Sequence, residues 1–275
     1  MTWYAESDTE LNLSESVSRV ENNKTILPLC DWTVLKDKGL ISSREEYIER
    51  VREISFAMAE AGIAESLSKK DVEMLQMVQT LDEIDNVINL LTERAVEWHS
   101  SITPEFSKKY SRFNSAKLLH KLSNSENFSM KRVAREIISL TDVRTTLMKD
   151  VSKKADAVIP NMSALVGGLV AARLVLRAGG LDEISKMAGS SIQVIGAESA
   201  LFSHIRTGSS SPKHGIIFQH RRVHNAPKEN RGRTARVLAS KLAIAARLDL
   251  YRGELDAEFI ADADKKINAA MGETK

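Results

Sequence analysis

The fold of this chain is decided by residues 74–98, MLQMVQTLDEIDNVINLLTERAVEW. Apolar residues recur there at steps of three and four, at Met74, Met77, Leu81, Ile84, Ile88, Leu91, Ala95 and Trp98. The positions between them are mostly Asp, Glu, Asn, Gln and Thr. This spacing puts the apolar side chains on one stripe of a helix for about three and a half heptads. It predicts a long helix that uses the stripe as a coiled-coil seam.

A second stripe follows after a polar turn. Its members are Met130, Val133, Ile137, Leu140, Leu147 and Val151. Residues 123–129 suit the turn between two helical arms, and Pro104 should end or bend the first arm because it lacks a backbone N–H donor. We expect a long antiparallel coiled-coil hairpin over residues 71–158. The alternative is two ordinary bundle helices packed on a globular core.

The composition is that of a helical globular protein. The chain has 275 residues, of which 43% are hydrophobic, 28% charged and only 5% aromatic. This length can bury a sizeable core. β-Sandwiches and barrels usually carry more aromatic and turn residues than this chain, which has 13 glycines and 5 prolines. We therefore predict a mostly α fold.

The cysteine content and the length of the apolar runs indicate the cellular compartment of the protein. Cys30 is the only cysteine, which excludes an intramolecular disulfide and a cysteine-based zinc site. Residues 1–13 are acidic and lack the apolar core of a signal peptide. No apolar run approaches the roughly 18 residues that a membrane span requires. These features predict a cytoplasmic protein with no membrane partner.

The sequence pattern divides the chain into four parts. They are a small N-terminal domain (residues 1–70), the hairpin (71–158), an all-helical C-terminal domain (159–255) and an acidic C-terminal tail (256–275). Residues 26–29 and 32–35 have the composition of short strands, so the first domain is a candidate α/β unit. Ser43 suits the N-cap of a following helix. Residues 162–176 are small and apolar, and we expect them at the buried centre of the C-terminal domain.

The net charge of +2 conceals a strong polarity along the chain. Residues 1–100 carry 10 Lys and Arg against 20 Asp and Glu. Residues 206–252 carry 11 Lys and Arg against 2 Asp and Glu, together with three of the six histidines. A basic window beside an acidic third indicates an anionic partner at one end and a different partner at the other.

The basic window, residues 206–252, has the residue types that contact nucleic acids. Three arginines open a predicted helix whose other face is apolar: Arg231, Arg233 and Arg236. Arginine forks match phosphate oxygens. Planar groups that can stack on unpaired bases lie just before them: Phe218, Gln219, His220 and His224. We infer nucleic-acid binding; the alternative is a solvated basic face without a partner.

The sequence contains no recognisable motif for catalysis or for a metal. His220 and His224 stand four apart, as zinc ligands on a helix do, but Arg221 stands where that motif requires a glutamate. There is no phosphate loop and no Gly-x-Ser-x-Gly elbow. We expect no metal and no catalytic residue, and hence no enzyme. The alternative of a different class is an enzyme that acts on nucleic acid through the His-rich basic window.

Five ordered blocks in the C-terminal half carry a further signal. They are GAESALF (196–202), PKHGIIFQH (212–220), VHNAP (223–227), RGRTAR (231–236) and LASKLAIAARLD (238–249). Together they resemble the Nop domain of archaeal C/D-box guide ribonucleoproteins. Residues 81–106 resemble the coiled-coil arm of this family, and residues 160–181 resemble the start of its Nop domain.

The resemblance implies a non-catalytic scaffold without a cofactor of its own. In such complexes the N-terminal region docks the fibrillarin methyltransferase, which brings S-adenosylmethionine, and the coiled coil pairs two copies. The all-helical Nop domain grips a kink-turn guide RNA together with a small ribosomal-type kink-turn-binding protein. The complex then methylates ribose 2′-hydroxyls. A related branch, the splicing-type Nop scaffolds, binds RNA without recruiting a methyltransferase.

The resemblance also assigns roles to individual residues. The RNA contacts it implies are Arg206, Lys213, His214, Gln219, His220, Arg221, Asn225, Lys228, Arg231, Arg233, Arg236 and Lys241. The contacts with other proteins of the ribonucleoprotein that it implies are made by Glu198, Phe202 and Phe218. Dimerisation falls to the seam residues Met74, Leu81, Ile84, Ile88, Leu91, Ile137 and Leu140. Ser199 and Ser203 stand where the family often has cations, so the RNA contacts of those cations are in doubt.

Overall fold

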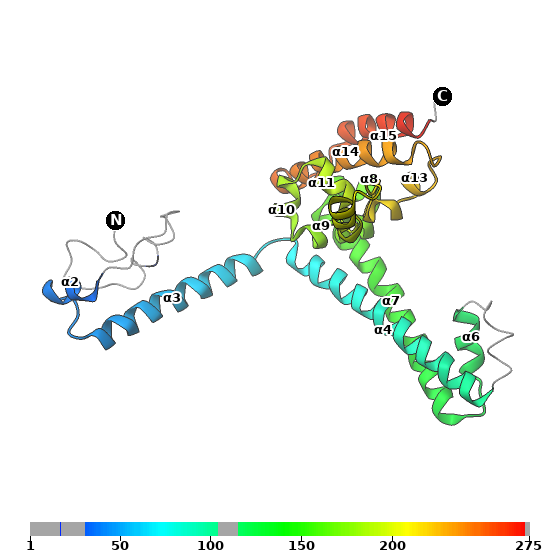
Figure 1. Cartoon of the computed structure of the whole chain (residues 1–275), viewed down its shortest axis with the longest axis horizontal. Helices are drawn as coiled ribbons and strands as arrows, with labels where there is room; N and C mark the ends of the chain where they lie inside the picture. The colour runs from blue at the N-terminus through cyan, green and yellow to red at the C-terminus, as the bar shows by residue number, and fades with distance from the viewer. Residues whose placement is uncertain (1–16, 18–30, 104–114, 273–275) are drawn as a thin grey trace. The chain divides into compact units, whose positions relative to one another are not determined.

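The computed structural model describes residue 17, residues 31–103 and residues 115–272 (Figure 1). Every element in these residues is a helix, and they contain no strand. The mostly α fold predicted from composition is therefore confirmed. The chain divides into two compact units, residues 1–69 and 70–275, and each is described by itself.

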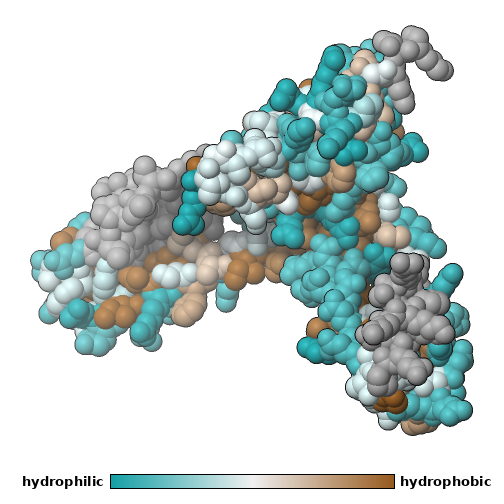
Figure 2. Space-filling view, turned by 45° about the vertical axis from the view of Figure 1, so that its right-hand side comes forward, coloured by the Kyte–Doolittle hydropathy of each residue, from teal (hydrophilic) through white to brown (hydrophobic). Residues whose placement is uncertain are grey.

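The first unit contains helices α2 (Trp32–Asp37) and α3 (Arg44–Leu67). The strand expected at residues 32–35 is wrong, because Asp31 caps a helix there by accepting a hydrogen bond from the backbone N–H of Thr33. The strand expected at 26–29 lies outside the described residues. Ser43 caps α3, as predicted: its Oγ accepts from the N–H of Glu46 at 3.2 Å. Exposed apolar side chains occur along α3 (Figure 2).

The second unit begins with two long helices, α4 (Val72–Ile102) and α7 (Phe128–Val158). They run side by side in opposite directions, and the short helix α6 (Ser115–Leu122) packs against α7 (Figure 1). Arg144 and Lys154 occupy stripe positions of α7 at the spacing of its apolar residues. Both form ion pairs across the hairpin, Arg144 with Asp85 and Lys154 with Glu73. The charged residues in the apolar stripe of α7 are therefore neutralised by carboxylates of α4.

The seam lies inside a single chain. Met74, Leu81 and Ile137 are each no more than 1% exposed. The other four seam candidates, Ile84, Ile88, Leu91 and Leu140, are partly buried. This corrects the assignment of Met74, Leu81 and Ile137 to dimer contacts, since a side chain without accessible surface cannot touch a second copy.

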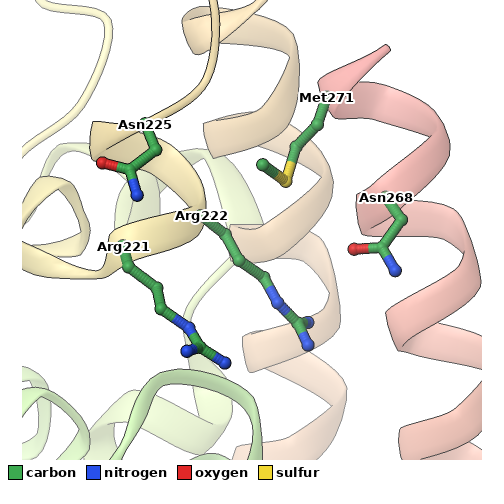
Figure 3. Close-up of a pocket in the computed structure, with 5 residues that line it drawn as sticks. All are labelled: Arg221, Arg222, Asn225, Asn268 and Met271. Atoms are coloured by element: carbon green, nitrogen blue, oxygen red, sulfur yellow. The ribbon is translucent and has the colours of Figure 1, made fainter. Parts of the chain in front are cut away.

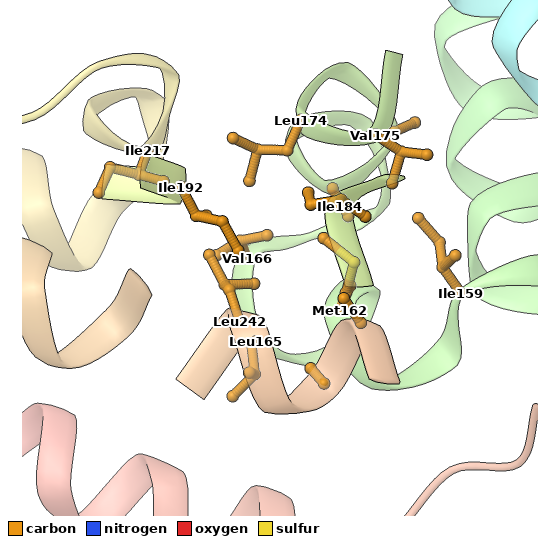
Figure 4. Packing of buried hydrophobic residues seen from close by; sticks show 14 of the residues in the cluster. Ile159, Met162, Leu165, Val166, Leu174, Val175, Ile184, Ile192, Ile217 and Leu242 are labelled. Atoms are coloured by element: carbon orange, nitrogen blue, oxygen red, sulfur yellow. The ribbon is translucent and has the colours of Figure 1, made fainter. Parts of the chain in front are cut away.

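Most of the C-terminal helices pack on one central helix, α14 (Arg231–Tyr251). The others are α8 (Pro160–Val166), α9 (Gly168–Ala178), α10 (Leu181–Lys186), α11 (Gly189–Val194), α12 (Glu198–Thr207), the 3-10 helix η1 (Ile216–Gln219), α13 (Arg221–His224) and α15 (Ala257–Met271). Figure 4 shows side chains from several of them meeting around Leu242 of α14. Residues 162–176 contribute Met162, Leu165 and Leu174 to this core, as expected.

Gly168 permits the closest helix contact in this core. A Cβ atom there would lie 2.7 Å from the carbonyl oxygen of Ser152 on α7, so α9 can approach α7 only with glycine at this position. Among the described residues no single helix is long and apolar enough to cross a membrane. Helices α8 and α9 reach the required length and apolarity only as a pair, and the chain bends by 117° between them.

The acidic tail expected at residues 256–275 instead contains a packed helix. Asp256 caps α15 by accepting from the N–H of Phe259 at 2.9 Å. Ala263, Ile267 and Ala270 are buried at helical spacing, and α15 packs on α14. The apolar stripe of α15 consists largely of alanines, and five of the 15 residues of this helix are charged. The helical domain therefore extends to residue 271 at least.

A buried carboxylate ties the domain together. Asp249 of α14 is 0% exposed and accepts hydrogen bonds from the N–H groups of Asn161 and Met162 at 2.8 and 2.9 Å. These donors belong to the first turn of α8, which has no cap of its own. The side chain of Asn161 adds a third hydrogen bond to Asp249 and a bond to the carbonyl of Glu254. Burial raises the pKa of Asp249, while these hydrogen bonds oppose the rise.

Candidate nucleic-acid interface

The basic window enters the domain through a segment anchored on α11. The N–H groups of Gly215 and Ile216 donate to the carbonyls of Gln193 and Ile195 at 2.9 and 2.8 Å. The side chain of Gln193 donates to the carbonyl of Lys213 at 2.7 Å. Apolar anchors at Ile217 and Val223 are fully buried. The polar side chains between these anchors are thereby held at the surface.

Three residues of the basic window come together around a fourth, Phe218. His214 stacks on its ring at 4.3 Å between centroids with an interplanar angle of 11°, and His224 tilts against it at 5.1 Å. The guanidinium of Arg231 lies 5.3 Å from the same ring and donates to the carbonyl of His224 at 3.1 Å. Phe218 is thus the centre of an internal stack. Its assignment as a protein contact stays a prediction, since the side chain remains partly exposed.

His220 is held neutral beside this stack. Burial, together with the positive charges of Arg222 and Arg221, lowers its pKa to about 4. Its Nδ1 atom is buried without a hydrogen-bond partner. At neutral pH the ring is therefore a hydrogen-bonding group rather than a cation.

Acid should destabilise the fold through His220. The pKa of an unperturbed histidine is 6.5, and that of His220 in the folded protein is about 4. As the pH falls through this interval, the unfolded chain binds the proton before the folded one, so the free energy of unfolding should decrease. Thermal unfolding of the wild type should show a steeper fall in Tm between these values than His220→Gln, which has no titrating ring. Equal falls in the two proteins would refute the assignment.

Gln219 connects the interface to the hairpin. It is exposed, and its Oε1 accepts from Arg173 of α9 at 3.3 Å. Arg173 also pairs with Asp82 at 2.8 Å and with Asp85 at 3.5 Å, both on α4. The sequence analysis missed Arg173, although a lone arginine within the apolar stretch 162–176 was the signal that could have found it.

The predicted cations fall into two groups. Six of them are exposed: Arg206, Lys213, Arg221, Lys228, Arg233 and Arg236. Lys241 is instead 12% exposed in its side chain, pairs with Asp262 of α15 at 2.7 Å and lies over the Phe259 ring. Its ammonium group is thus engaged within the fold, and its assignment as an RNA contact stays a prediction. Arg222 is engaged in the same way by Asp264.

Helix α12 carries the two remaining candidates for protein contacts. Glu198 accepts from the N–H of Gly196 at 2.6 Å, and this hydrogen bond lowers the pKa of its carboxyl group. Phe202 is 72% exposed, as is Ile205, and α12 has no fully buried residue. Arg206 lies at the end of this helix, and no hydrogen bond or ion pair joins it to the stack within the described residues. These residues likewise contain no group of three or more His, Cys, Asp or Glu placed to hold a metal.

The comparison with protein families decides what this domain is. A model described as "Nop: snoRNA binding domain, fibrillarin" matches residues 38–271. The chain belongs to the Nop family. The resemblance found in the sequence is thereby confirmed, and the matched region of this Nop protein includes the hairpin and α15.

Known proteins similar to this Nop chain occur in archaea and eukaryotes. An uncharacterised NOP5 family protein of Methanocaldococcus jannaschii is 31% identical over 86% of the chain and 66% of its own length. Nucleolar protein 56 of Saccharomyces cerevisiae is 31% identical over 79% of the chain and 51% of its own length. A chain of the crystal structure of a fibrillarin/Nop5p complex is 27% identical, with a TM-score of 0.57 and 98% coverage of both chains. The chain thus spans between half and two thirds of these two curated relatives.

Proposed function

We propose that this Nop protein is a non-catalytic core scaffold of a C/D-box guide ribonucleoprotein that directs ribose 2′-O-methylation of RNA. The observation that carries the proposal is the family match over residues 38–271, which includes the whole of the basic interface. The exposed arginines and lysines of that interface suit phosphate oxygens, and Gln219 and His220 suit the edges of unpaired bases.

The proposed protein partners are a fibrillarin-type methyltransferase and a small kink-turn-binding protein of ribosomal type. The structural neighbour from a fibrillarin/Nop5p complex and the acidic charge of residues 1–100 support the first. The exposed Phe202 and Ile205 of α12, close in sequence to the basic window, support the second. The methyltransferase would bind S-adenosylmethionine, so the scaffold needs no cofactor.

Self-association through the coiled-coil hairpin is the remaining part of the proposal. Because the seam is used between α4 and α7, the contact with a second copy has to use their outer faces. Val87, Leu90 and Val143 are between 45% and 55% exposed on these faces. They offer apolar surface that the hairpin itself does not cover.

Reconstitution with omission tests the scaffold function. The purified chain, methyltransferase, kink-turn-binding protein, guide RNA and substrate RNA are combined with labelled S-adenosylmethionine. Methylation should require all of them, and the chain alone should have no activity on RNA. Activity of the chain alone would favour the enzyme alternative. RNA binding without recruitment of the methyltransferase would favour a splicing-type scaffold.

Arg233→Glu should weaken the complex with RNA without melting the fold. Arg233 is exposed on the first turn of α14, and reversing its charge replaces attraction to phosphate by repulsion. We expect the affinity for kink-turn RNA to fall by about tenfold or more. Arg135→Glu makes the same charge change at an exposed position of α7, outside the basic window and α15, and serves as the control. A large drop in Tm in Arg233→Glu would show that Arg233 is structural instead.

A further inference from the structure

A pocket of about 350 Å³ opens between α13 and α15. Its lining residues are Arg221, Arg222, Asn225, Asn268 and Met271. Figure 3 shows the two arginine side chains extending from α13 and Asn268 facing them from α15. The pocket therefore joins the basic window to a helix that the sequence analysis treated as a tail.

Two of its polar groups lack partners. Within the described part of the chain, neither the guanidinium of Arg221 nor the amide of Asn268 makes a hydrogen bond or an ion pair. Arg222 gives one nitrogen to Asp264 and keeps its other donors, because a guanidinium carries five N–H groups. The side-chain oxygen of Asn225 is engaged by His224, which leaves the amide nitrogen available.

The shape of this donor set favours a phosphate group. Two guanidinium groups and two amides place several N–H donors around one space, and arginine forks match phosphate oxygens in geometry and charge. Asp264 does not line the pocket and neutralises only one of the two arginines. Met271 adds an apolar contact of the kind that a ribose can lie against. A phosphate alone would not fill the volume, whereas a phosphate with its attached ribose would fill more of it.

We propose that this pocket binds one backbone phosphate of the RNA, with the neighbouring ribose against Met271, so that α15 completes the RNA-binding surface. The proposal rests on the proposed function and extends it to residues outside the basic window. Asn268 is a binding residue in it. Arg221 and Asn225 line this pocket, which faces α15. Phe218 and His214, which form the stack, do not line it.

Two carboxylate substitutions one residue apart provide a matched test. Asn268→Asp places a negative charge in the pocket, where it would occupy the arginines and repel a phosphate. Ala269→Asp adds the same charge to the same turn of α15, at an exposed position outside the pocket lining. Their long-range effects on RNA are alike because both sites lie within one Debye length of each other. Both also place an acid near the end of the helix, so any cost from the helix dipole is shared.

The experiment measures binding of kink-turn RNA to the full chain, with the kink-turn-binding protein, over a salt series. Asn268→Asp should lower the affinity about tenfold more than Ala269→Asp does and reduce the salt slope by about 1. Arg221→Gln should give a similar loss, and unchanged Tm values would confirm that the variants are folded. Equal affinities of the two aspartate variants, with the wild type binding normally, would overturn the pocket but leave the proposed function standing.

Inorganic phosphate distinguishes the backbone of RNA from a free anion. The Tm of the wild type and of Asn268→Asp is measured with and without excess phosphate. Stabilisation of the wild type alone, together with unchanged RNA affinity of Asn268→Asp, would assign the pocket to a free anion and overturn the proposal. Absence of RNA binding by the wild type would overturn the proposed function and the pocket together.

Discussion

Asp249→Ala should destabilise the second unit more than any exposed substitution. The change leaves the N–H groups of Asn161 and Met162 buried without an acceptor at the start of α8. Each orphaned buried donor costs about 1–3 kcal/mol, so the free energy of unfolding should fall by about 4 kcal/mol. Urea unfolding followed by circular dichroism measures this loss.

A double-mutant cycle provides the control for Asp249. Asn161→Ala removes one side-chain donor to the carboxylate, the donor to the carbonyl of Glu254 and the acceptor of the N–H of Asp256. The two substitutions touch one network, so their effects should not add. If Asp249→Ala cost less than about 1 kcal/mol, the carboxylate would not be the cap of α8.

Leu81→Asp should break the hairpin. Leu81 is 1% exposed and packs in the main core, so the change removes a buried apolar side chain and leaves a carboxylate without a partner. The loss in free energy of unfolding should be at least about 4 kcal/mol. Self-association should be lost together with the hairpin, and analytical sedimentation measures this loss.

Leu90→Asp is the matched control for stability on the same helix. Because Leu90 lies on the outer face proposed to contact a second copy, self-association should weaken in this variant too. Leu90 is 55% exposed, and an exposed substitution usually changes the free energy of unfolding by no more than about 0.5 kcal/mol. The two variants therefore separate the buried seam from the outer face. A Leu81→Asp protein with wild-type stability that still ran as a dimer would contradict both the seam and the proposed role of the hairpin.

Most of the fold that the sequence predicted was inferred from the helical periodicity of apolar residues. In α4 and α7 the apolar spacing is regular for several turns, and the structure buries the residues that the stripe selects, such as Met74 and Leu81. The same pattern does not say which surface covers a stripe. A partner helix in the same chain and a second copy of the chain give the same periodicity, so the dimer assignment failed where the hairpin used the seam.

In two helices, α2 and α15, the apolar pattern is too short or too weak to be recognised by its periodicity. Residues 32–35 contain two β-branched residues and an aromatic one, but a single cap at Asp31 was enough to begin a helix. In α15 the buried stripe consists of Ala263, Ile267 and Ala270, which together show little hydrophobicity beside six acidic residues in 253–275. Tertiary packing on α14 determines both its helicity and its place in the domain.

The sequence predicted which types of residue make up the candidate site, but not which of their side chains contact one another. The cluster of arginine, histidine and glutamine was visible in the sequence, and the structure brings His214, Phe218, His224 and Arg231 together. Charge counting could not show that Lys241 is engaged by Asp262, because the two residues are 21 positions apart and meet only when α15 packs on α14. For the same reason Asn268 could not be assigned.

The central claim is that this chain binds RNA as a scaffold, together with a protein partner. A gel shift on kink-turn RNA, with and without the kink-turn-binding protein over a salt series, tests it most directly. The account predicts a supershifted complex that forms only with that protein and persists as the salt concentration rises. Equal binding to any RNA, with or without the partner and fading steeply with salt, would contradict it, because the basic interface would then be only an electrostatic surface.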